Sequence, residues 1–196
     1  MSKLKGSKTL VNLMKAFAGE SQARNRYTYF ASVARKEGYK QIEGYFSETA
    51  DNEKEHAERF YKFMAEGIDV VPDSISIAAD FPVAMQTTVE NLKMAAAGEN
   101  EEWSILYPAF AKTADEEGFS EIASVFRNIC VAEQAHEKRY LKLIENIQNG
   151  VVFDRAEEIV WKCGNCGYHH TGKSAPDKCP ACDHPKAYFE LFVENY

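Results

Sequence analysis

The sequence predicts a mainly α-helical protein, in which a four-helix bundle with one long crossover precedes a small domain of strands and loops. Two observations support this fold class. The first 150 residues contain four long segments in which apolar side chains recur at the helical period. From Trp161 onward the chain is rich in glycine, proline and cysteine, and its extended pieces are short. We therefore expect a helical domain over residues 1–150 and a small second domain over residues 151–196.

The helical segments are expected at about residues 7–36, 40–66, 82–117 and 120–149. Gly38 and Gly118 supply the breaks within the first and the second pair of helices. The stretch between the pairs, residues 67–82, is apolar, poorly periodic and contains two prolines. A short hairpin link would not need such a stretch, so we expect a crossover that runs the length of the bundle.

The two halves of the helical region resemble each other. At an offset of 80 residues, the matching pairs include Tyr27 with Tyr107, Glu53 with Glu133 and His56 with His136. The tripeptide Ala-Gly-Glu at 18–20 recurs at 97–99, which is an offset of 79. One extra residue therefore lies between Glu99 and Tyr107. An inserted residue in a helix commonly forms a π-turn, so we expect a π-turn there.

Seven acidic or imidazole side chains fall on the inward stripes of these helices, where most neighbours are apolar. They are Glu20, Glu53, His56, Glu99, Glu102, Glu133 and His136. An ionised carboxylate buried without a partner is very costly, so such groups are paired or bind metal. Inward basic residues are scarce, and Arg24 is the one near candidate. Two divalent cations would neutralise the set; buried salt bridges without metal are the alternative.

The motif Glu-x-x-His occurs once in each half, and its spacing places both side chains on one helix face. Two such motifs, with a glutamate from each of the other two helices, form the layout of a carboxylate-bridged dimetal centre. Mixed carboxylate and imidazole ligands favour iron or manganese. Glu102 has no counterpart in the first half and adds one carboxylate. Tyr27 and Tyr107 lie near these ligands, either as hydrogen-bond donors to them or as ordinary core aromatics.

Two Cys-x-x-Cys pairs predict a second metal site in the small domain. The four residues are Cys163, Cys166, Cys179 and Cys182. Two such pairs hold one tetrahedral metal through four thiolates, and their spacing fits both iron and zinc. The fifth cysteine, Cys130, is expected to be a small buried apolar residue.

The overall composition excludes several classes of function. The net charge is −7 and no basic block stands out, so nucleic acid is not expected as a partner. The first residues are too polar for a signal peptide, and no apolar run approaches the roughly 18 residues of a membrane span. We therefore expect a soluble, cytoplasmic protein. The chain shows no glycine-rich dinucleotide fingerprint, so it is not expected to bind a nicotinamide cofactor itself.

Over essentially its whole length the chain resembles the rubrerythrin family. The resemblance is carried by Glu20, Glu53, His56, Glu99, Glu102, Glu133, His136 and the two Cys-x-x-Cys pairs, in that order. It implies a ferritin-like diiron bundle followed by a rubredoxin-like domain with one iron bound by four cysteines. Asp183 departs from the pattern, because simple rubredoxins often have glycine after the second cysteine pair.

The resemblance also implies a role for each bundle residue in an oxo- and carboxylate-bridged diiron centre. The implied assignment is Glu53 and Glu133 bridging, Glu20 and Glu102 on one iron, and Glu99 and His136 on the other. In the family, the residue at the position of His56 replaces the carboxylate at the position of Glu102 when the centre is reduced. We therefore take His56, Glu102 and Tyr27 as the candidate catalytic residues.

The activity that the resemblance implies is a peroxidase that reduces hydrogen peroxide to water and protects against oxidative stress. Electrons would come through the iron of the four-cysteine site from rubredoxin or an external NAD(P)H-dependent reductase. A homodimer is implied, with or without exchange of helices hinged at residues 67–82, and His184 would link the small domain to Glu20 of the other subunit. The alternatives are a ferroxidase that handles iron and a structural protein whose four-cysteine site holds zinc.

Overall fold

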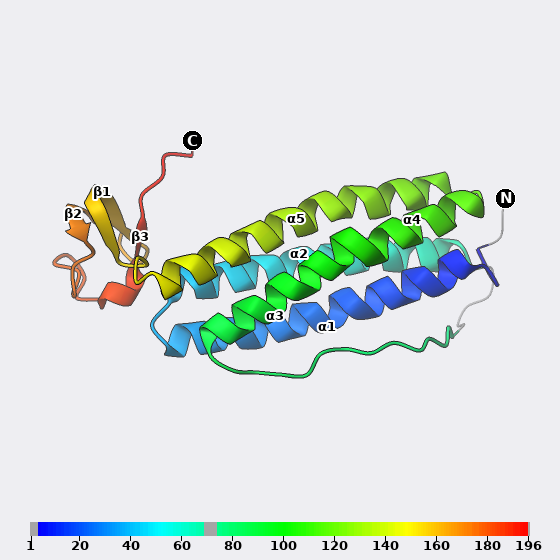
Figure 1. Ribbon diagram of the computed structural model, residues 1–196, viewed down its shortest axis with the longest axis horizontal. Helices are drawn as coiled ribbons and strands as arrows, with labels where there is room; N and C mark the ends of the chain where they lie inside the picture. Colours follow the sequence, from blue (N-terminus) through cyan, green and yellow to red (C-terminus); the bar gives the residue numbers. More distant parts are fainter. Residues whose placement is uncertain (1–3, 69–73, 196) are drawn as a thin grey trace.

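A computed structural model of the chain describes residues 4–68 and 74–195. Its elements are α1 (Lys8–Lys36), α2 (Lys40–Glu66), α3 (Thr88–Glu101), the π-helix η1 (Glu102–Leu106), α4 (Tyr107–Glu116), α5 (Ser120–Gln148), β1 (Asp154–Cys163), β2 (His169–Ser174), the 3-10 helix η2 (Lys186–Tyr188) and β3 (Phe189–Leu191). They form a ferritin-like four-helix bundle followed by a small three-stranded domain (Figure 1), and this confirms the predicted fold class.

The bundle consists of two pairs of antiparallel helices. In Figure 1, α1 lies along α2, while α3, η1 and α4 form one continuous rod that lies along α5. The connection from α2 to α3 runs along the outside of the bundle and returns the chain to the end where α1 finishes. This agrees with the predicted crossover over residues 67–82, of which residues 69–73 lie outside the described part of the chain.

The third helix begins later than the sequence predicts. Its expected start at about residue 82 is wrong, because α3 begins at Thr88 with Thr87 as its N-cap. The Asn91 side chain explains the difference: it accepts a hydrogen bond from Gln86 N–H and donates one to Gln86 O, both at 2.9 Å. These two bonds satisfy the backbone of Gln86 outside the helix, and the Thr87 hydroxyl then accepts a hydrogen bond from the first turn.

The predicted π-turn is confirmed between Glu99 and Tyr107. It is the five-residue element η1, and Glu102 is its first residue. The helix is continuous on both sides, so the inserted residue is absorbed without a break in the rod. Both Glu99 and Tyr107 therefore point into the bundle, as Glu20 and Tyr27 do in the first half, and all four are buried.

Two clusters of aromatic side chains fill the bundle on either side of the polar residues. One contains Phe60, Tyr107 and Phe126, and the other contains Phe46, Tyr27 and Tyr140. Each member of one cluster lies 80 residues from a member of the other, so the internal repeat relates the two clusters. In each, two rings come from one half of the chain and the third comes from the other half.

The small domain is an antiparallel sheet with strand order β2-β1-β3. Trp161 lies in its core, fully buried, and its indole N–H donates to Gly172 O at 3.0 Å. Asp183, the residue that departs from the family pattern, has φ +64°. A short polar side chain tolerates this left-handed conformation better than most residues other than glycine, so the turn is preserved.

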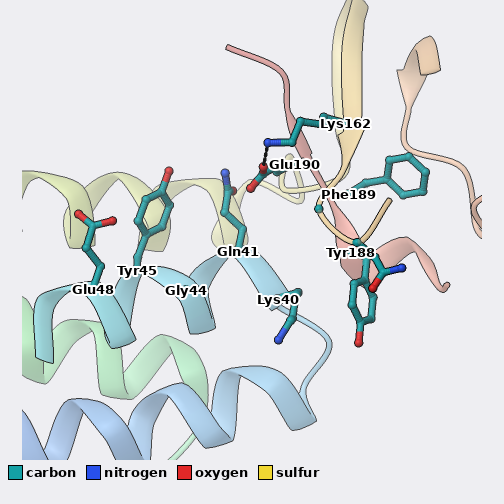
Figure 2. Close-up of a pocket in the computed structure, with 11 residues that line it drawn as sticks. Lys40, Gln41, Gly44, Tyr45, Glu48, Lys162, Tyr188, Phe189 and Glu190 are labelled. Carbon is teal, nitrogen blue, oxygen red and sulfur yellow. Dashed lines mark ion pairs between the residues drawn. The ribbon is translucent and has the colours of Figure 1, made fainter. Parts of the chain in front are cut away.

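The small domain lies at one end of the bundle, against the start of α2. The rings of Tyr39 and Phe153 stack with their centroids 6.4 Å apart. Beside this contact is a pocket of about 600 Å³ between α2 and the Cys163 loop, and the Lys162–Glu190 ion pair at 2.9 Å closes one side of it (Figure 2). Over the described residues, no helix combines the length and the apolar character that crossing a membrane requires.

Candidate metal centres

The predicted ligands gather at mid-length of the bundle from α1, α2, the α3–η1 part of the third rod, and α5. The predicted ligands are Glu20 on α1, Glu53 and His56 on α2, Glu99 on α3, Glu102 on η1, and Glu133 and His136 on α5. Among the carboxylates, Glu20, Glu53, Glu99 and Glu133 are at most 1% exposed. The helix period therefore places these residues where the sequence predicts them, inside the bundle.

Six of these seven residues form two overlapping groups with the geometry of metal ligands. The first group is Glu20, Glu53, His56 and Glu133, and the second is Glu53, Glu99, Glu133 and His136. Within each group, one ligand atom from every residue lies within 4.8 Å of all the others. Glu53 and Glu133 belong to both groups, so each can offer oxygen to two neighbouring cations.

Both histidines face these carboxylates through Nδ1. His56 Nδ1 lies 3.0 Å from Glu53 Oε2 and 3.0 Å from Glu133 Oε1. His136 Nδ1 lies 2.8 Å from Glu133 Oε2 and 3.3 Å from Glu53 Oε1. On its other side, His136 Nε2 lies 3.2 Å from Asn52 Oδ1, which fixes the plane of the ring.

Glu102 is the one predicted ligand that the structure leaves outside both groups. Its carboxylate lies beside α1, with Oε1 3.8 Å from the position that a Cβ on Gly19 would take. His56 takes its place next to Glu20, with 3.8 Å between His56 Nδ1 and Glu20 Oε1. In this structure, therefore, the imidazole and not the Glu102 carboxylate completes the first group.

Burial and mutual repulsion set the protonation of the site. Burial, followed by the charge of neighbouring acids, raises the pKa of Glu20 and of Glu99 well above the ordinary value. Burial opposes a charge on the imidazoles too, but their hydrogen bonds to Glu133 and Glu53 raise the pKa of His56 to about 10 and of His136 to about 12. The same hydrogen bonds outweigh burial at Glu133 and lower its pKa to about 2.

The residues fit a pair of divalent cations. Five buried carboxylate oxygens accept no well-aligned hydrogen bond in the described part of the chain, although the imidazoles lie close to those of Glu53 and Glu133: Glu20 Oε2, Glu53 Oε1, Glu99 Oε2 and both oxygens of Glu133. Buried acceptors left unpaired are costly, and two cations between the groups would satisfy them. Oxygen and imidazole donors in this ratio suit iron or manganese.

Two buried tyrosines donate hydrogen bonds to the outer carboxylates. Tyr27 OH donates to Glu99 Oε1 at 2.5 Å, and Tyr107 OH donates to Glu20 Oε1 at 2.5 Å. Of the two alternatives that the sequence left open for these tyrosines, the structure supports the hydrogen-bonding one. They orient equivalent glutamates in the two halves of the repeat.

Sequence reasoning identified the wrong arginine and missed one polar residue. Arg24 is exposed, whereas Arg26 extends into the bundle wall, with Nε and Nη1 buried. Helix period alone did not separate the two, because both lie at the edge of the inward stripe of α1. Asn52, the partner of His136, was missed, although its place next to Glu53 on the same helix was a usable signal.

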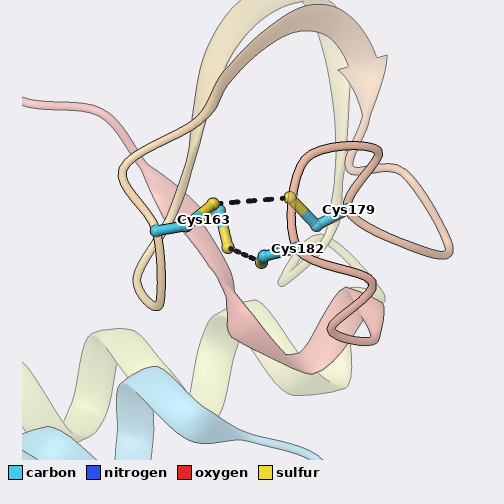
Figure 3. Close-up of side chains that lie close together, drawn as sticks. Cys163, Cys179 and Cys182 are labelled. Atoms are coloured by element: carbon cyan, nitrogen blue, oxygen red, sulfur yellow. Dashed lines mark hydrogen bonds between the residues drawn. The ribbon is translucent and has the colours of Figure 1, made fainter.

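The four predicted cysteines of the small domain come together from two loops. Figure 3 shows the sulfurs of Cys163, Cys179 and Cys182 pointing toward one another. The Sγ atoms of Cys163 and Cys182 are 3.8 Å apart, and those of Cys166 and Cys179 are 3.7 Å apart. Tetrahedral thiolate ligands at about 2.3 Å from a metal are separated by about 3.8 Å, so the spacing fits one iron or zinc ion. A hydrogen bond from the backbone N–H of His184 lowers the pKa of the Cys182 thiol to about 6.

The remaining candidate residues lie away from these groups. Cys130 is 9% exposed and packs in the apolar cluster of Phe60, as predicted for a small buried residue. His184 lies beside the four-cysteine site, with Nδ1 3.0 Å from Cys182 O and its ring against Tyr188. Its expected contact with another subunit stays a prediction.

Comparison with known proteins agrees with this geometry. The Rubrerythrin family model matches residues 12–144, and the model "Rubrerythrin, rubredoxin-like domain" matches residues 161–190. Rubrerythrin from Porphyromonas gingivalis is 59% identical over 98% of this chain and 94% of its own length. Rubrerythrin from Clostridium perfringens is 58% identical over the full length of both chains.

Solved structures show the same architecture. Nigerythrin in a mixed-valence state superimposes with a TM-score of 0.62 at 34% identity, over 97% of this chain and 92% of its own. Desulfovibrio desulfuricans bacterioferritin, described with its diiron site in different catalytic states, gives a TM-score of 0.63 at 25% identity, over 74% of this chain and 82% of its own. With a buried glutamate and histidine cluster, a four-cysteine site and these full-length similarities, the chain belongs to the rubrerythrin family.

Proposed function

We propose that this chain is a non-haem diiron peroxidase that reduces hydrogen peroxide to water. The observation that carries the proposal is the pair of four-residue groups that share Glu53 and Glu133, found in the same chain as a four-cysteine site. Two ferrous ions held there would each supply one electron to the O–O bond, and two protons would complete two molecules of water. An iron bound by four cysteines in the same protein is suited to returning electrons one at a time.

The chain's own residues would orient the ligands and supply protons. Tyr27 and Tyr107 fix Glu99 and Glu20 through their short hydrogen bonds, so both carboxylates present one oxygen toward the centre. Burial, followed by the charge of Glu99, raises the pKa of Glu102 well above the ordinary value. A raised pKa favours the protonated form of the Glu102 carboxyl, which could deliver its proton to a departing oxygen. His56 and Glu102 are thus proposed as the residues that act at the peroxide.

The external partners belong to the same proposal. We infer that rubredoxin or an NAD(P)H-dependent reductase reduces the four-cysteine site, and that the protein works as a homodimer. His184 lies beside the four-cysteine site, with Nδ1 3.0 Å from Cys182 O, and in this proposal it lies on the path of electrons to the other subunit. Mixing a Cys163→Ser variant with a Glu53→Gln variant would test it. Recovered turnover in the mixed dimer is expected if electrons cross between subunits.

The direct test separates the two metal sites. In Cys163→Ser the bundle should still be oxidised once by peroxide after chemical reduction, but steady-state turnover with a reductase should be lost. Cys130→Ser is the matched control, since Cys130 lies outside the group of four cysteines. Steady-state peroxidase activity that is unchanged in Cys163→Ser, with the metal of the four-cysteine site absent, would contradict the proposal.

A ferroxidase that handles iron is the second candidate. The similarity to bacterioferritin over 74% of this chain favours it, because the bundles share one fold. Storage requires a large hollow assembly, for which an attached four-cysteine domain has no evident use. Light scattering distinguishes the two: a dimer agrees with the peroxidase, and a shell of many subunits agrees with storage.

A further inference from the structure

A pocket of about 360 Å³ lies beside the bundle site, between α1, the α3–η1–α4 rod and residues 78–82 of the crossover. Two of its lining residues link it to the site. Glu102 is the predicted ligand outside both groups, and Tyr107 donates its hydrogen bond to Glu20. Residues 78–82 are exposed to solvent, so the pocket joins the surface of the protein to the candidate centre.

The pocket is much larger than hydrogen peroxide requires. A water molecule occupies about 30 Å³ in the liquid, and hydrogen peroxide has only one more oxygen atom. Pockets that bind small organic ligands begin at about 300 Å³. The volume of about 360 Å³ therefore fits an organic molecule with several carbon atoms.

Two glycines in helix interiors leave part of this space empty. Gly19 on α1 and Gly98 on α3 both line the pocket, at equivalent positions of the repeated tripeptide Ala-Gly-Glu. A Cβ at Gly19 would have Glu102 Oε1 as its nearest neighbour, at 3.8 Å, and one at Gly98 would have Arg26 Nη2, at 4.0 Å. Both are ordinary contact distances, so close packing does not require glycine. Since glycine costs about 1 kcal/mol relative to alanine within a helix, the chain gives up helix stability at both positions and gains space in the pocket.

The same two contacts fix the direction of the pocket along the bundle. Gly19 precedes Arg26 on α1, whereas their neighbours Glu102 and Gly98 are in the reverse order on the rod. The two walls are therefore antiparallel. Residues before Gly19 on α1 consequently lie opposite residues after Glu102 on the rod.

Beyond Glu102 the wall of the pocket is apolar. Leu106 and Phe110 follow Glu102 at intervals of four residues, and both line the pocket on the same face of the rod. On α1, Ala16 belongs to the apolar cluster against which these two side chains pack. In the other direction the wall is polar and includes Gln22. Glu102 thus lies between an apolar half and a polar half of the pocket.

We propose that this pocket admits small organic hydroperoxides, with the alkyl group against Leu106 and Phe110 and the peroxide group beside Glu102. This use of the pocket rests on the proposed function, because the diiron centre supplies the two electrons. The O–O bond breaks as it takes up these electrons and two protons, and the products are one alcohol and one water molecule. Burial of the alkyl group favours the organic substrate, whereas hydrogen peroxide gains nothing from the apolar half.

The test compares tert-butyl hydroperoxide with hydrogen peroxide as oxidants of the reduced, iron-loaded protein. Gly19→Leu fills the pocket beside Glu102, and Gly44→Leu is the matched control. Gly44 lies within α2 and outside this pocket, and a Cβ there meets nothing within 4 Å. In a single turnover, Gly19→Leu is expected to lower the rate with tert-butyl hydroperoxide about tenfold relative to the rate with hydrogen peroxide. Gly44→Leu should leave the ratio of the two rates at its wild-type value.

Binding to the metal-free protein gives a second measurement. The alcohol that the reaction would release, tert-butanol, is titrated while methyl resonances are followed by NMR. The methyl groups of Ala16 and Leu106 should shift with saturation in wild type and in Gly44→Leu, and these shifts should be lost in Gly19→Leu. If Gly19→Leu does not fold, Gly19→Ala replaces it, because a methyl group fits at that position and favours the helix.

The outcomes distinguish this inference from the proposed function. Two results would overturn the role of the pocket and leave the peroxidase in place: reduction of hydrogen peroxide without any reaction of tert-butyl hydroperoxide, or equal rate ratios in Gly19→Leu and Gly44→Leu. Shifts confined to methyl groups outside the pocket would overturn that role as well. An iron-loaded protein that reduces neither oxidant would overturn the proposed function, and this inference with it.

Discussion

Glu53 and Glu133 are the two residues that both candidate cation positions would share. Each belongs to both ligand groups, and each is within reach of both imidazoles. In the metal-free chain, protons on His56 and His136 place positive charge between these carboxylates. They therefore neutralise part of the negative charge, as metal cations would. The same residues are therefore arranged for two alternative occupants, protons or metal ions, and the balance between them depends on pH.

The metal-free bundle is expected to be more stable at about pH 6 than at about pH 9. The pKa of His56 is raised to about 10 and that of His136 to about 12, above the unfolded value near 6.5. A raised pKa stabilises the fold fully below the unfolded value and loses that contribution as pH rises through the folded value. The raised pKa values of Glu20 and Glu99 act in the same direction. Melting temperatures measured in chelator across this range test the expectation.

Bound cations supply the control for that measurement. Metal ligands must be deprotonated, so the protein saturated with Co²⁺ should gain stability as pH rises over the same range. A metal-free melting temperature that increases from about pH 6 to about pH 9 would contradict the protonation described for the imidazoles.

Replacing Tyr27 with phenylalanine is expected to weaken cation binding by about tenfold or more. The change removes the 2.5 Å hydrogen bond to Glu99 while keeping the ring that packs in the aromatic cluster. Tyr107→Phe should act similarly through Glu20. Isothermal titration with Co²⁺ measures the effect, and Tyr29→Phe is the matched control because that side chain is 55% exposed. Equal affinities in Tyr27→Phe and the control would show that the hydrogen bond does not orient Glu99.

For single residues, the sequence predicted the position of a side chain correctly wherever that position follows from the helix face that the residue occupies. All four inward glutamates outside η1, and both histidines, fall within the two ligand groups. Arg24 was the wrong choice. Arg24 and Arg26 are about 200° apart around the axis of α1, at opposite edges of the inward stripe, and packing decides which of them turns inward. Glu102 begins the π-turn and lies outside both groups, and the sequence located that turn without fixing where the side chain lies.

The π-helix is the element that makes the two halves of the site unequal. Without the inserted residue, the position three after Glu99 would correspond to Ala23, three after Glu20 in the first half. Ala23 is buried in the bundle. The wider turn of η1 rotates Glu102 away from that place, so a carboxylate can occupy the bundle wall next to a pocket instead of the packed interior.

The N-terminus of α3 offers a test at the scale of an element. Thr87→Ala is expected to reduce the free energy of unfolding by about 1 kcal/mol, because its hydroxyl caps the first turn. Urea unfolding measures the loss. Thr113→Ala is the control, since that hydroxyl only donates to Ala109 O within its own helix. Equal stabilities of the two variants would show that the Thr87 hydroxyl does not stabilise the first turn of α3.

Helix ends were the part of each element that the sequence predicted least well. The apolar period of α1, α2 and α5 located them to within about one residue of the observed ends. The start of α3 was placed six residues too early because residues 82–87 contain no glycine and only one proline, at their beginning. The side chain of Asn91 decides that boundary through a contact that no period reveals.

At the scale of the whole molecule, one stacked pair of rings links the two metal-binding parts. Tyr39 lies at the start of α2 and Phe153 lies in the segment that leads into β1. Lys40 extends over the Tyr188 ring, 5.8 Å from its centroid, beside this pair. The change in composition predicts a division of the chain. It does not predict how the small domain sits against the bundle, because that depends on single aromatic residues that repeat nowhere in the sequence.

Tyr39→Ala is expected to release the small domain from the bundle while leaving both metal sites intact. Small-angle scattering should show a larger radius of gyration, and the amides of the small domain should tumble faster by NMR. Metal content should not change, since the side chain contacts neither ligand group. Tyr29→Ala removes an exposed ring from α1 and serves as the control. Identical scattering from the two variants would show that the stacked rings do not hold the domain in place.

Each aromatic cluster contains two rings from one half of the chain and one ring from the other half. This mixed origin bears on how such a chain could have arisen. A lone hairpin made from either half would contain two rings of one cluster and one ring of the other. It would complete neither, and it would carry only one Glu-x-x-His motif. Such an ancestor would be stable and able to hold ions only when paired with a second copy of itself. Gene fusion would then have made that pairing permanent, and a difference of one residue between the halves would have made the two halves of the site unequal.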